Sequence, residues 1–240
     1  MSMKRIITVY VFLFLGIGAF AQEETEYGTG LVKDDEAYLK IPLKPTLLTR
    51  DYEILPESYS LKQYCPKVGS QGSYGTCSAW SSTYAARTIA EAIKWGWTNQ
   101  DVITQESFAP LFVYAQVKSK VDSVCLRGVR MNDALETLKT KGAPKKNHFN
   151  VQCADNAPSW VADEAKDYRI EDYFTLFNSL CNSREEKVNK VKTCLWFPRI
   201  LQNQLHVSLS VNPIWICTCD FWESVHFKHA LKMLRTSLPL

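Results

Sequence analysis

The sequence predicts an α+β fold in which a helical half precedes a half built from strands. Between residues 76 and 141, apolar residues recur every three or four positions, which indicates amphipathic helices. Later, the stretch HVSLSV at residues 206–211 alternates apolar and polar side chains, as a half-buried strand does. Of the 240 residues, 46% are hydrophobic and 22% are charged, which suits one sizeable domain or two small lobes.

The first 21 residues are expected to be a signal peptide. Lys4 and Arg5 precede an apolar run at residues 6–20, and cleavage is expected after Ala21. The run is short and wrongly flanked for a membrane span, although a membrane anchor is the alternative interpretation. We therefore expect a secreted or periplasmic protein in an oxidising compartment, where some of the eight cysteines can form disulfides.

Charge argues against nucleic acid as a partner, and hydropathy argues against a membrane. Loss of Lys4 and Arg5 with the signal peptide lowers the formal net charge from +3 to +1, and no long basic tract stands out, so nucleic acid is not expected. No second apolar run is long enough to span a bilayer, so no membrane contact is expected after cleavage. The oligomeric state has no signature in the sequence.

The first segment after the signal peptide differs from the rest of the chain. Residues 22–53 start with an acidic stretch and lack clear periodicity, so they are interpreted as a mobile leader or a short pro-segment. Residues 54–240 are assigned to the folded domain, with denser structure from Leu55. Residues 67–75 contain three glycines and two serines, and they are predicted to form a loop.

A helix should follow this loop, from Thr76 or Cys77 to the neighbourhood of Gly96. Its core-facing stripe is predicted to be Ala79, Thr83, Ala86, Ala90, Ile93 and Trp97.

Two further helices and two strands complete the expected elements. Residues 108–121 and 132–141 are helix candidates, and Gly142 should end the second. Residues 168–177 and 206–216 have the composition of strands.

The stretch GSQGSYGTCSAW at residues 69–80 combines features of a nucleophilic site. A cysteine attacks as the thiolate, and unpaired N–H groups in the first turn of a helix favour that anion at Cys77. Gln71 lies across the loop, where its side-chain amide and the backbone N–H of Cys77 could stabilise an oxyanion. The alternative is a buried structural thiol after an ordinary glycine loop.

The same stretch resembles the active-site segment of papain-like cysteine peptidases, with the pattern Q-G-x-C-G-S-C-W-A-F. Ser78 stands where that family has a tryptophan, and Tyr74 stands where it has a cysteine that pairs within the helical lobe. The version Tyr-Gly-Thr-Cys is most similar to secreted bacterial members. The residues that match directly are Gln71, Gly72, Gly75, Cys77 and Ala79.

This resemblance implies a two-lobed fold, a helical lobe beside an antiparallel sheet lobe, with the site in the cleft between them. It implies an endopeptidase or exopeptidase that hydrolyses peptide or protein substrates through an acyl-enzyme on Cys77, with Gln71 in the oxyanion hole and no cofactor. The family's base is a histidine at the start of a strand, and KHAL at His229 copies its pattern. His226 is the near alternative and His206 is the third candidate.

The chain departs from the family after His229. The asparagine that orients the histidine is absent from the last eleven residues, and so are the strands that complete the sheet lobe. We therefore expect an incomplete sheet lobe, from a truncated or frame-shifted gene or in an inactive relative that only binds peptides. A further alternative is a zinc-stapled interaction domain, because Cys217, Cys219, His226 and His229 combine thiolate and imidazole ligands.

Overall fold

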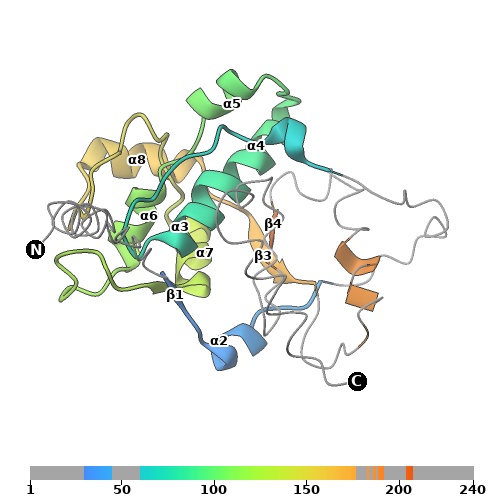
Figure 1. The fold of residues 1–240 in the computed structure, drawn as a ribbon, viewed down its shortest axis with the longest axis horizontal. Helices are drawn as coiled ribbons and strands as arrows, with labels where there is room; N and C mark the ends of the chain where they lie inside the picture. The colour runs from blue at the N-terminus through green and yellow to red at the C-terminus, as the bar shows by residue number, and fades with distance from the viewer. Residues whose placement is uncertain are drawn as a thin grey trace, which may run out of the picture.

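A helical rod from Cys77 to Trp95 forms the centre of the fold (Figure 1). The computed structural model describes residues 30–44 and 60–176, the positions 183, 186, 187 and 189–191, and the backbone of 204–207. The helices are α2 (Asp35–Leu39), α3 (Cys77–Ala79), α4 (Thr88–Trp95), α5 (Gln100–Gln105), α6 (Pro110–Val117), α7 (Met131–Thr140) and α8 (Ser159–Asp167), with a 3₁₀ turn η2 (Lys62–Tyr64) and a π-helical segment η3 (Trp80–Arg87). The strands are β1 (Leu31–Val32), β2 (Val129–Arg130), β3 (Asp172–Thr175) and β4 (Gln204–Val207).

The rod confirms the predicted helix and its ends. It begins at Cys77, and Gly96 ends it in the left-handed conformation with φ of 67°. Ala79, Thr83 and Ala90 of the predicted stripe are buried. Burial is wider than one stripe, however, because η3 is wound with a longer repeat than an α-helix and is enclosed on several sides.

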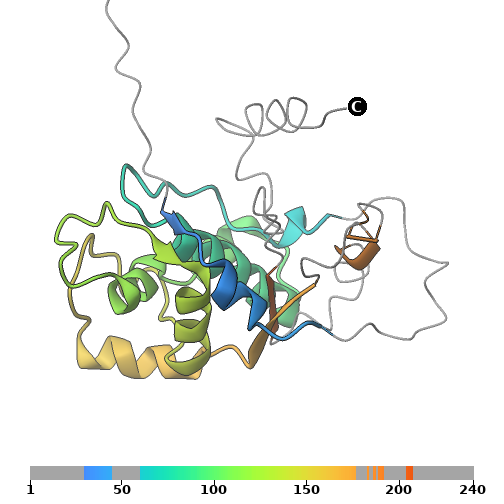
Figure 2. The same ribbon diagram turned by 90° about the horizontal axis from the view of Figure 1, so that it is seen from below.

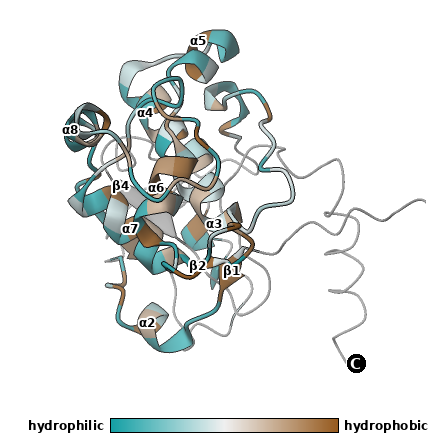
Figure 3. Ribbon diagram, turned by 90° about the vertical axis from the view of Figure 1, so that its left-hand side faces the viewer, coloured by the Kyte–Doolittle hydropathy of each residue, from teal (hydrophilic) through white to brown (hydrophobic). Residues whose placement is uncertain are grey.

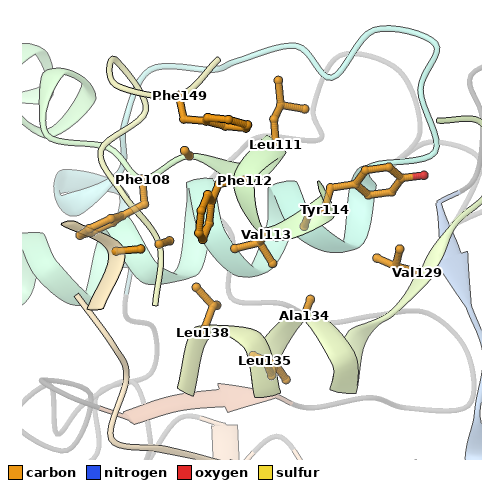
Figure 4. Packing of buried hydrophobic residues seen from close by; sticks show 14 of the residues in the cluster. Phe108, Leu111, Phe112, Val113, Tyr114, Val129, Ala134, Leu135, Leu138 and Phe149 are labelled. Atoms are coloured by element: carbon orange, nitrogen blue, oxygen red, sulfur yellow. The ribbon is translucent and has the colours of Figure 1, made fainter. Parts of the chain in front are cut away.

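The main hydrophobic core lies between the rod, α6 and α7. Figure 3 shows α6 as a predominantly hydrophobic helix, and all residues from Pro110 to Tyr114 are buried. Figure 4 shows Phe112 and Val113 of α6 beside Leu135 and Leu138 of α7. Phe149 closes the other side, with its ring 5.8 Å from that of Phe112 and almost perpendicular to it. This packing holds the rod against two helices and so fixes its N-terminal end.

The predicted bounds of α6 and α7 differ from the observed ones by one to four residues. The candidate at 108–121 is helical over Pro110–Val117, since Pro110 sets the first turn and Lys118 is extended. The candidate at 132–141 runs from Met131 to Thr140, and Gly142, with φ of 78°, follows its end as predicted.

Both sheets that the structure describes have two strands, and both are parallel. β1 pairs with β2 in the register Leu31↔Val129, and β3 pairs with β4 in the register Asp172↔Gln204. The antiparallel sheet that the sequence analysis expected is therefore not found among the described residues. The mixture of helices with small sheets agrees with the α+β class at that coarse level.

Part of the segment before Leu55, which the sequence analysis interprets as a mobile leader or a short pro-segment, forms regular structure. Its described part, residues 30–44, forms β1 and α2 and then returns to the body of the protein, where Leu43 pairs with Thr175 of β3. Ile41 is buried. Figure 2 shows this blue segment running across one face of the molecule. These segments pair with residues about 100 or more positions away. Such long-range contacts cannot be predicted from the local periodicity of the sequence.

The described part of the chain includes no helix that is both long and apolar enough to cross a membrane. The predicted signal peptide at residues 1–21 lies outside the described residues, as do residues 208–216 of the second predicted strand.

Candidate active site

Cys77 is the first residue of the central rod, and the preceding loop delivers it there. Thr76 takes the N-cap position, and its carbonyl oxygen accepts the N–H of Trp80 at 3.0 Å. On the loop side, the N–H of Gly75 donates to the carbonyl oxygen of Cys125 at 2.8 Å. The nucleophile candidate is therefore held at a helix start that is bonded to a second, disulfide-anchored loop.

Cys77 is also the free thiol among the described cysteines. Cys125 and Cys153 form a disulfide, with 5.5 Å between their Cα atoms, and Cys65 is disulfide-bonded as well. This agrees with the expectation that some of the cysteines pair while Cys77 stays reduced. Cys77 is half-buried.

Burial and backbone hydrogen bonding act in opposite directions on this thiol. Burial raises the pKa of Cys77, and the backbone N–H groups of Gly30, Ser78 and Cys77 lower it, with a net pKa above the ordinary value. The helix start thus makes the predicted contribution through the Ser78 and Cys77 amides. Among the described residues this contribution is smaller than that of burial, and the activation of the thiolate stays a prediction.

Gln71 lies in the same loop, three residues before Tyr74, and is half-buried. Its Nε2 donates to the carbonyl oxygen of Tyr74 at 3.0 Å. This bond fixes the amide within the loop that leads into Cys77. Because an amide nitrogen carries two N–H groups, one donor remains for an oxyanion.

The N-terminal segment contacts the sulfur of Cys77 directly. The N–H of Gly30 donates to Sγ of Cys77 at 2.8 Å, across 47 positions in the sequence. The carbonyl oxygen of Gly30 accepts the N–H of Val129 at 3.0 Å. Ser78 completes the junction, since its hydroxyl lies 3.0 Å from the carbonyl oxygens of both Gly30 and Val129.

Ser78 and Gly30 are the site residues that sequence reasoning missed. In the sequence Ser78 stands out only as a departure from the family's tryptophan, yet its hydroxyl connects the rod to Gly30, which precedes β1, and to Val129 of β2. Gly30 belongs to the stretch GTGLV, whose glycines give no hint of a partner so distant in the chain.

The buried carboxylate of Asp122 holds the segment that leads into β2. Asp122 accepts the Tyr114 hydroxyl at 2.8 Å and the N–H groups of Leu126 and Arg127 at 3.2 and 3.1 Å. The Tyr114 hydroxyl also bonds to the carbonyl oxygen of Arg127. Burial and the bond to Asp122 raise the pKa of Tyr114, so this tyrosine stays a neutral donor at physiological pH.

The predicted bases are not brought to Cys77 within the described residues. His229 and His226 lie outside them, and His206 is on β4, of which the backbone alone is described. His148 is exposed, as expected, and its Nδ1 lies 2.8 Å from Glu164. The proposed zinc ligands Cys217 and Cys219 also lie outside the described residues. Within the described part, no group of three His, Cys, Asp or Glu side chains could hold a metal ion.

A comparison with solved structures identifies a protein of similar fold. The structure is similar to the crystal structure of xylellain, a cysteine protease from Xylella fastidiosa, with a TM-score of 0.50 and 18% sequence identity. The match covers 70% of this chain and 62% of xylellain, so the chain spans less than two thirds of that protein. No family model matches the chain, and neither does any curated protein. The likeness is one of fold, and the fold of this chain is therefore similar to that of a cysteine protease.

Proposed function

We propose that this chain is an exported cysteine peptidase with Cys77 as its nucleophile. The observation that carries the proposal is a free, half-buried thiol at the start of the central helix, in a fold similar to that of a cysteine protease. The Cys125–Cys153 disulfide supports export, because such bonds persist in oxidising compartments. Residues 1–21 would be the signal peptide, 22–53 a leader or short pro-segment and 54–240 the peptidase domain.

In the proposed reaction, the Cys77 thiolate attacks the carbonyl carbon of a peptide bond. The backbone N–H of Cys77 and the amide of Gln71 stabilise the oxyanion, and the amine leaves with a proton from a histidine. Water then attacks the thioester, which releases the acid and restores the thiol. His229 is the proposed base, with His226 and His206 as the alternatives, and no cofactor takes part.

The test combines covalent labelling with hydrolysis of a denatured protein such as casein by the full chain. A peptidyl chloromethyl ketone should label Cys77, which mass spectrometry of the labelled peptide identifies. Cys77→Ala should abolish hydrolysis, Gln71→Ala should lower it about 10²–10³-fold, and His229→Ala about 10²–10⁴-fold. His148→Ala is the matched control, since His148 bonds to Glu164, and it should keep full activity.

Two results would contradict the proposal in different ways. Hydrolysis that survives Cys77→Ala would place the activity on another residue. A folded chain that binds peptides but does not hydrolyse them or react with the chloromethyl ketone would favour the alternative of an inactive peptide-binding protein, which the raised pKa of Cys77 permits. Stoichiometric zinc, lost together with the fold on chelation, would favour the zinc-stapled domain.

A further inference from the structure

A chain of hydrogen bonds leads from the buried carboxylate of Asp122 to the loop that carries Cys77. Its first link is the peptide group between Cys125 and Leu126. The N–H of this group donates to Oδ1 of Asp122 at 3.2 Å, and its carbonyl oxygen accepts the N–H of Gly75 at 2.8 Å. Because a trans peptide group is planar, its N–H and its C=O point in opposite directions. The carboxylate and the N–H of Gly75 therefore hold one peptide plane from its two sides.

A second peptide group continues this chain to Gln71. The N–H of Gly75 and the carbonyl oxygen of Tyr74 belong to the same peptide group, and that oxygen accepts Nε2 of Gln71 at 3.0 Å. The side-chain amide of Gln71 thus takes its position from a peptide plane that is itself fixed by the first one. Three hydrogen bonds and two peptide planes separate the carboxylate of Asp122 from the proposed oxyanion donor.

The carboxylate at the start of this chain has a fixed place. Asp122 is only 2% exposed, and its Oδ2 accepts the Tyr114 hydroxyl at 2.8 Å and the N–H of Arg127 at 3.1 Å. Tyr114 is itself part of the main hydrophobic core. Because both carboxylate oxygens are used, the side chain of Asp122 cannot turn without losing several hydrogen bonds at once.

The two segments approach each other so closely that glycine is needed where they meet. A Cβ atom at Gly75 would lie 2.6 Å from the carbonyl oxygen of Leu126 and 2.9 Å from that of Arg127. Cys125 has a φ of 56°, a left-handed conformation that non-glycine residues seldom adopt. Such a backbone persists where its surroundings hold it. Here the disulfide to Cys153 and the hydrogen bond of the next peptide N–H do so.

Charge makes this chain stronger than a row of neutral hydrogen bonds. A hydrogen bond to a carboxylate is stronger than one between neutral groups, and successive hydrogen bonds polarise one another. The charge of Asp122 therefore strengthens the bond that the Cys125 carbonyl accepts from Gly75, and in turn the bond that holds Gln71. An amide nitrogen that is fixed through one N–H points its second N–H in a set direction.

We propose that Asp122 is a positioning residue for the peptidase reaction, which acts through the two peptide groups to aim the second N–H of Gln71 at the oxyanion. The inference rests on the proposed function. Donors that are already oriented stabilise an oxyanion because they need not reorganise when the charge develops. Loss of the Asp122 charge should therefore lower kcat and leave KM nearly unchanged, because the contact with the oxyanion is made only in the transition state.

The test is a double-mutant cycle of Asp122→Asn and Gln71→Ala in the full chain. The substrate is a casein peptide that the chain cleaves, synthesised with a fluorophore and a quencher. Asp122→Asn should lower kcat about 10–10²-fold, less than the loss of the Gln71 amide itself. In the Gln71→Ala chain it should cost less than about threefold more, because the amide through which it acts is already gone. Losses that multiply, or full kcat in folded Asp122→Asn, would overturn the proposal.

Asp155→Asn is the matched control for this change. The Asp155 carboxylate lies in the neighbouring loop, 2.6 Å from Nζ of Lys118, and 79% of its side chain is exposed. The same chemical change at this place should leave kcat unchanged. If Asp155→Asn lowered kcat as much as Asp122→Asn does, the effect would be a general loosening of these loops, and the proposal would fail.

A second variant decides the case if Asp122→Asn does not fold. Tyr114→Phe removes the hydroxyl that donates to Oδ2 of Asp122 and keeps the bond from Leu126 to Oδ1. It should lower kcat about two- to tenfold, the range for one lost hydrogen bond to a charged group, and it should do so only while Gln71 is present. An equal loss in the wild-type and Gln71→Ala chains would refute the role of Asp122.

The side-chain amide signal of Gln71 in the ¹H–¹⁵N NMR spectrum gives a readout that needs no hydrolysis. Its absence from the spectrum of Gln71→Ala assigns it. In Asp122→Asn, but not in Asp155→Asn, this signal should move toward that of a free glutamine amide and exchange with D₂O at least about tenfold faster.

These outcomes separate the two proposals. If the Gln71 signal moves in this way but the wild type hydrolyses no casein, the hold of Asp122 on Gln71 stands and the peptidase proposal fails. If the wild type hydrolyses casein and the signal does not move in Asp122→Asn, the peptidase stands and the positioning role of Asp122 fails.

Discussion

At the scale of single residues, the central rod carries a buried ion pair. Nη1 of Arg87 lies 2.7 Å from Oε2 of Glu91, and both side chains are more than nine-tenths buried. Nε1 of Trp95 donates to the second carboxylate oxygen at 2.8 Å, and the guanidinium lies over the Phe108 ring. A buried pair with these additional partners keeps both charges compensated.

We expect Glu91→Gln to lower the free energy of unfolding by about 3–5 kcal/mol, because it leaves the Arg87 guanidinium buried without its counter-charge. Urea unfolding at pH 7 measures the loss. Glu36→Gln is the matched control, since Glu36 pairs with Lys40 at the same i,i+4 spacing at 2.8 Å but with both side chains more than 70% exposed. It should cost less than about 0.5 kcal/mol.

The same carboxylate should make stability depend on pH. Burial by itself would raise the pKa of Glu91, but Arg87 and the Trp95 N–H lower it below the ordinary glutamate value. A group with a lowered folded-state pKa contributes its stability above the unfolded pKa of about 4.3, and that contribution is lost as the pH falls through the folded value. The difference between wild type and Glu91→Gln should therefore be largest near pH 7 and shrink below about pH 4. A difference that grows on acidification would contradict this.

At the scale of elements, two helices end on left-handed glycines in different surroundings. Gly96 ends the rod with φ of 67°, and a Cβ there meets nothing within 4 Å. Gly142 follows α7 with φ of 78°, and a Cβ there would overlap the carbonyl oxygen of Ala165 in α8. Residue 96 therefore needs glycine only for the left-handed backbone conformation. Residue 142 needs glycine for that conformation and also because no room is left for a Cβ atom beside α8.

Gly96→Ala should cost about 1–2 kcal/mol of unfolding free energy, the usual penalty for a left-handed non-glycine residue. Gly142→Ala should cost clearly more, by about another 1–3 kcal/mol for the steric overlap with α8. Urea unfolding of both variants measures the difference, and Gly96→Asn, which tolerates this conformation, should lose less than Gly96→Ala. Equal losses at the two positions would show that α8 moves away without cost.

The elements also show which patterns the sequence reveals. The rod, α6 and α7 were predicted because their apolar residues recur with helical spacing over two turns or more. α5 and α8 were missed, since α5 has six residues with Ile103 as its one buried member, and α8 buries only Val161 and Ala165. The Asn99 cap, whose Oδ1 accepts the N–H of Asp101 at 2.9 Å, was the available signal for α5.

At the scale of the whole molecule, the Cys125–Cys153 disulfide joins the loop before β2 to the loop before α8, across 28 positions. Replacing both cysteines by serine should lower the free energy of unfolding by about 3–4 kcal/mol, because the unfolded chain gains the freedom of that loop. Urea unfolding of the double variant measures this. Cys77→Ala is the control and should change stability by less than about 1 kcal/mol. If the double variant loses less than about 1 kcal/mol, the disulfide does not stabilise the fold by constraining the unfolded chain.

Short stretches of the sequence encode the local parts of the candidate site. The glycine loop, the helix start at Cys77 and the helix end at Gly96 follow from neighbours within a few residues, through turn chemistry, caps and periodicity. The tertiary structure alone decided what lies on the thiol, because Gly30 is 47 positions away and reaches Sγ only through the pairing of β1 with β2. It also decided the sign of the change in the pKa of Cys77, since burial is set by segments packed from elsewhere in the chain. Contacts between distant residues leave no periodic trace, which is why the sequence predicted the nucleophile but not the strand that covers it.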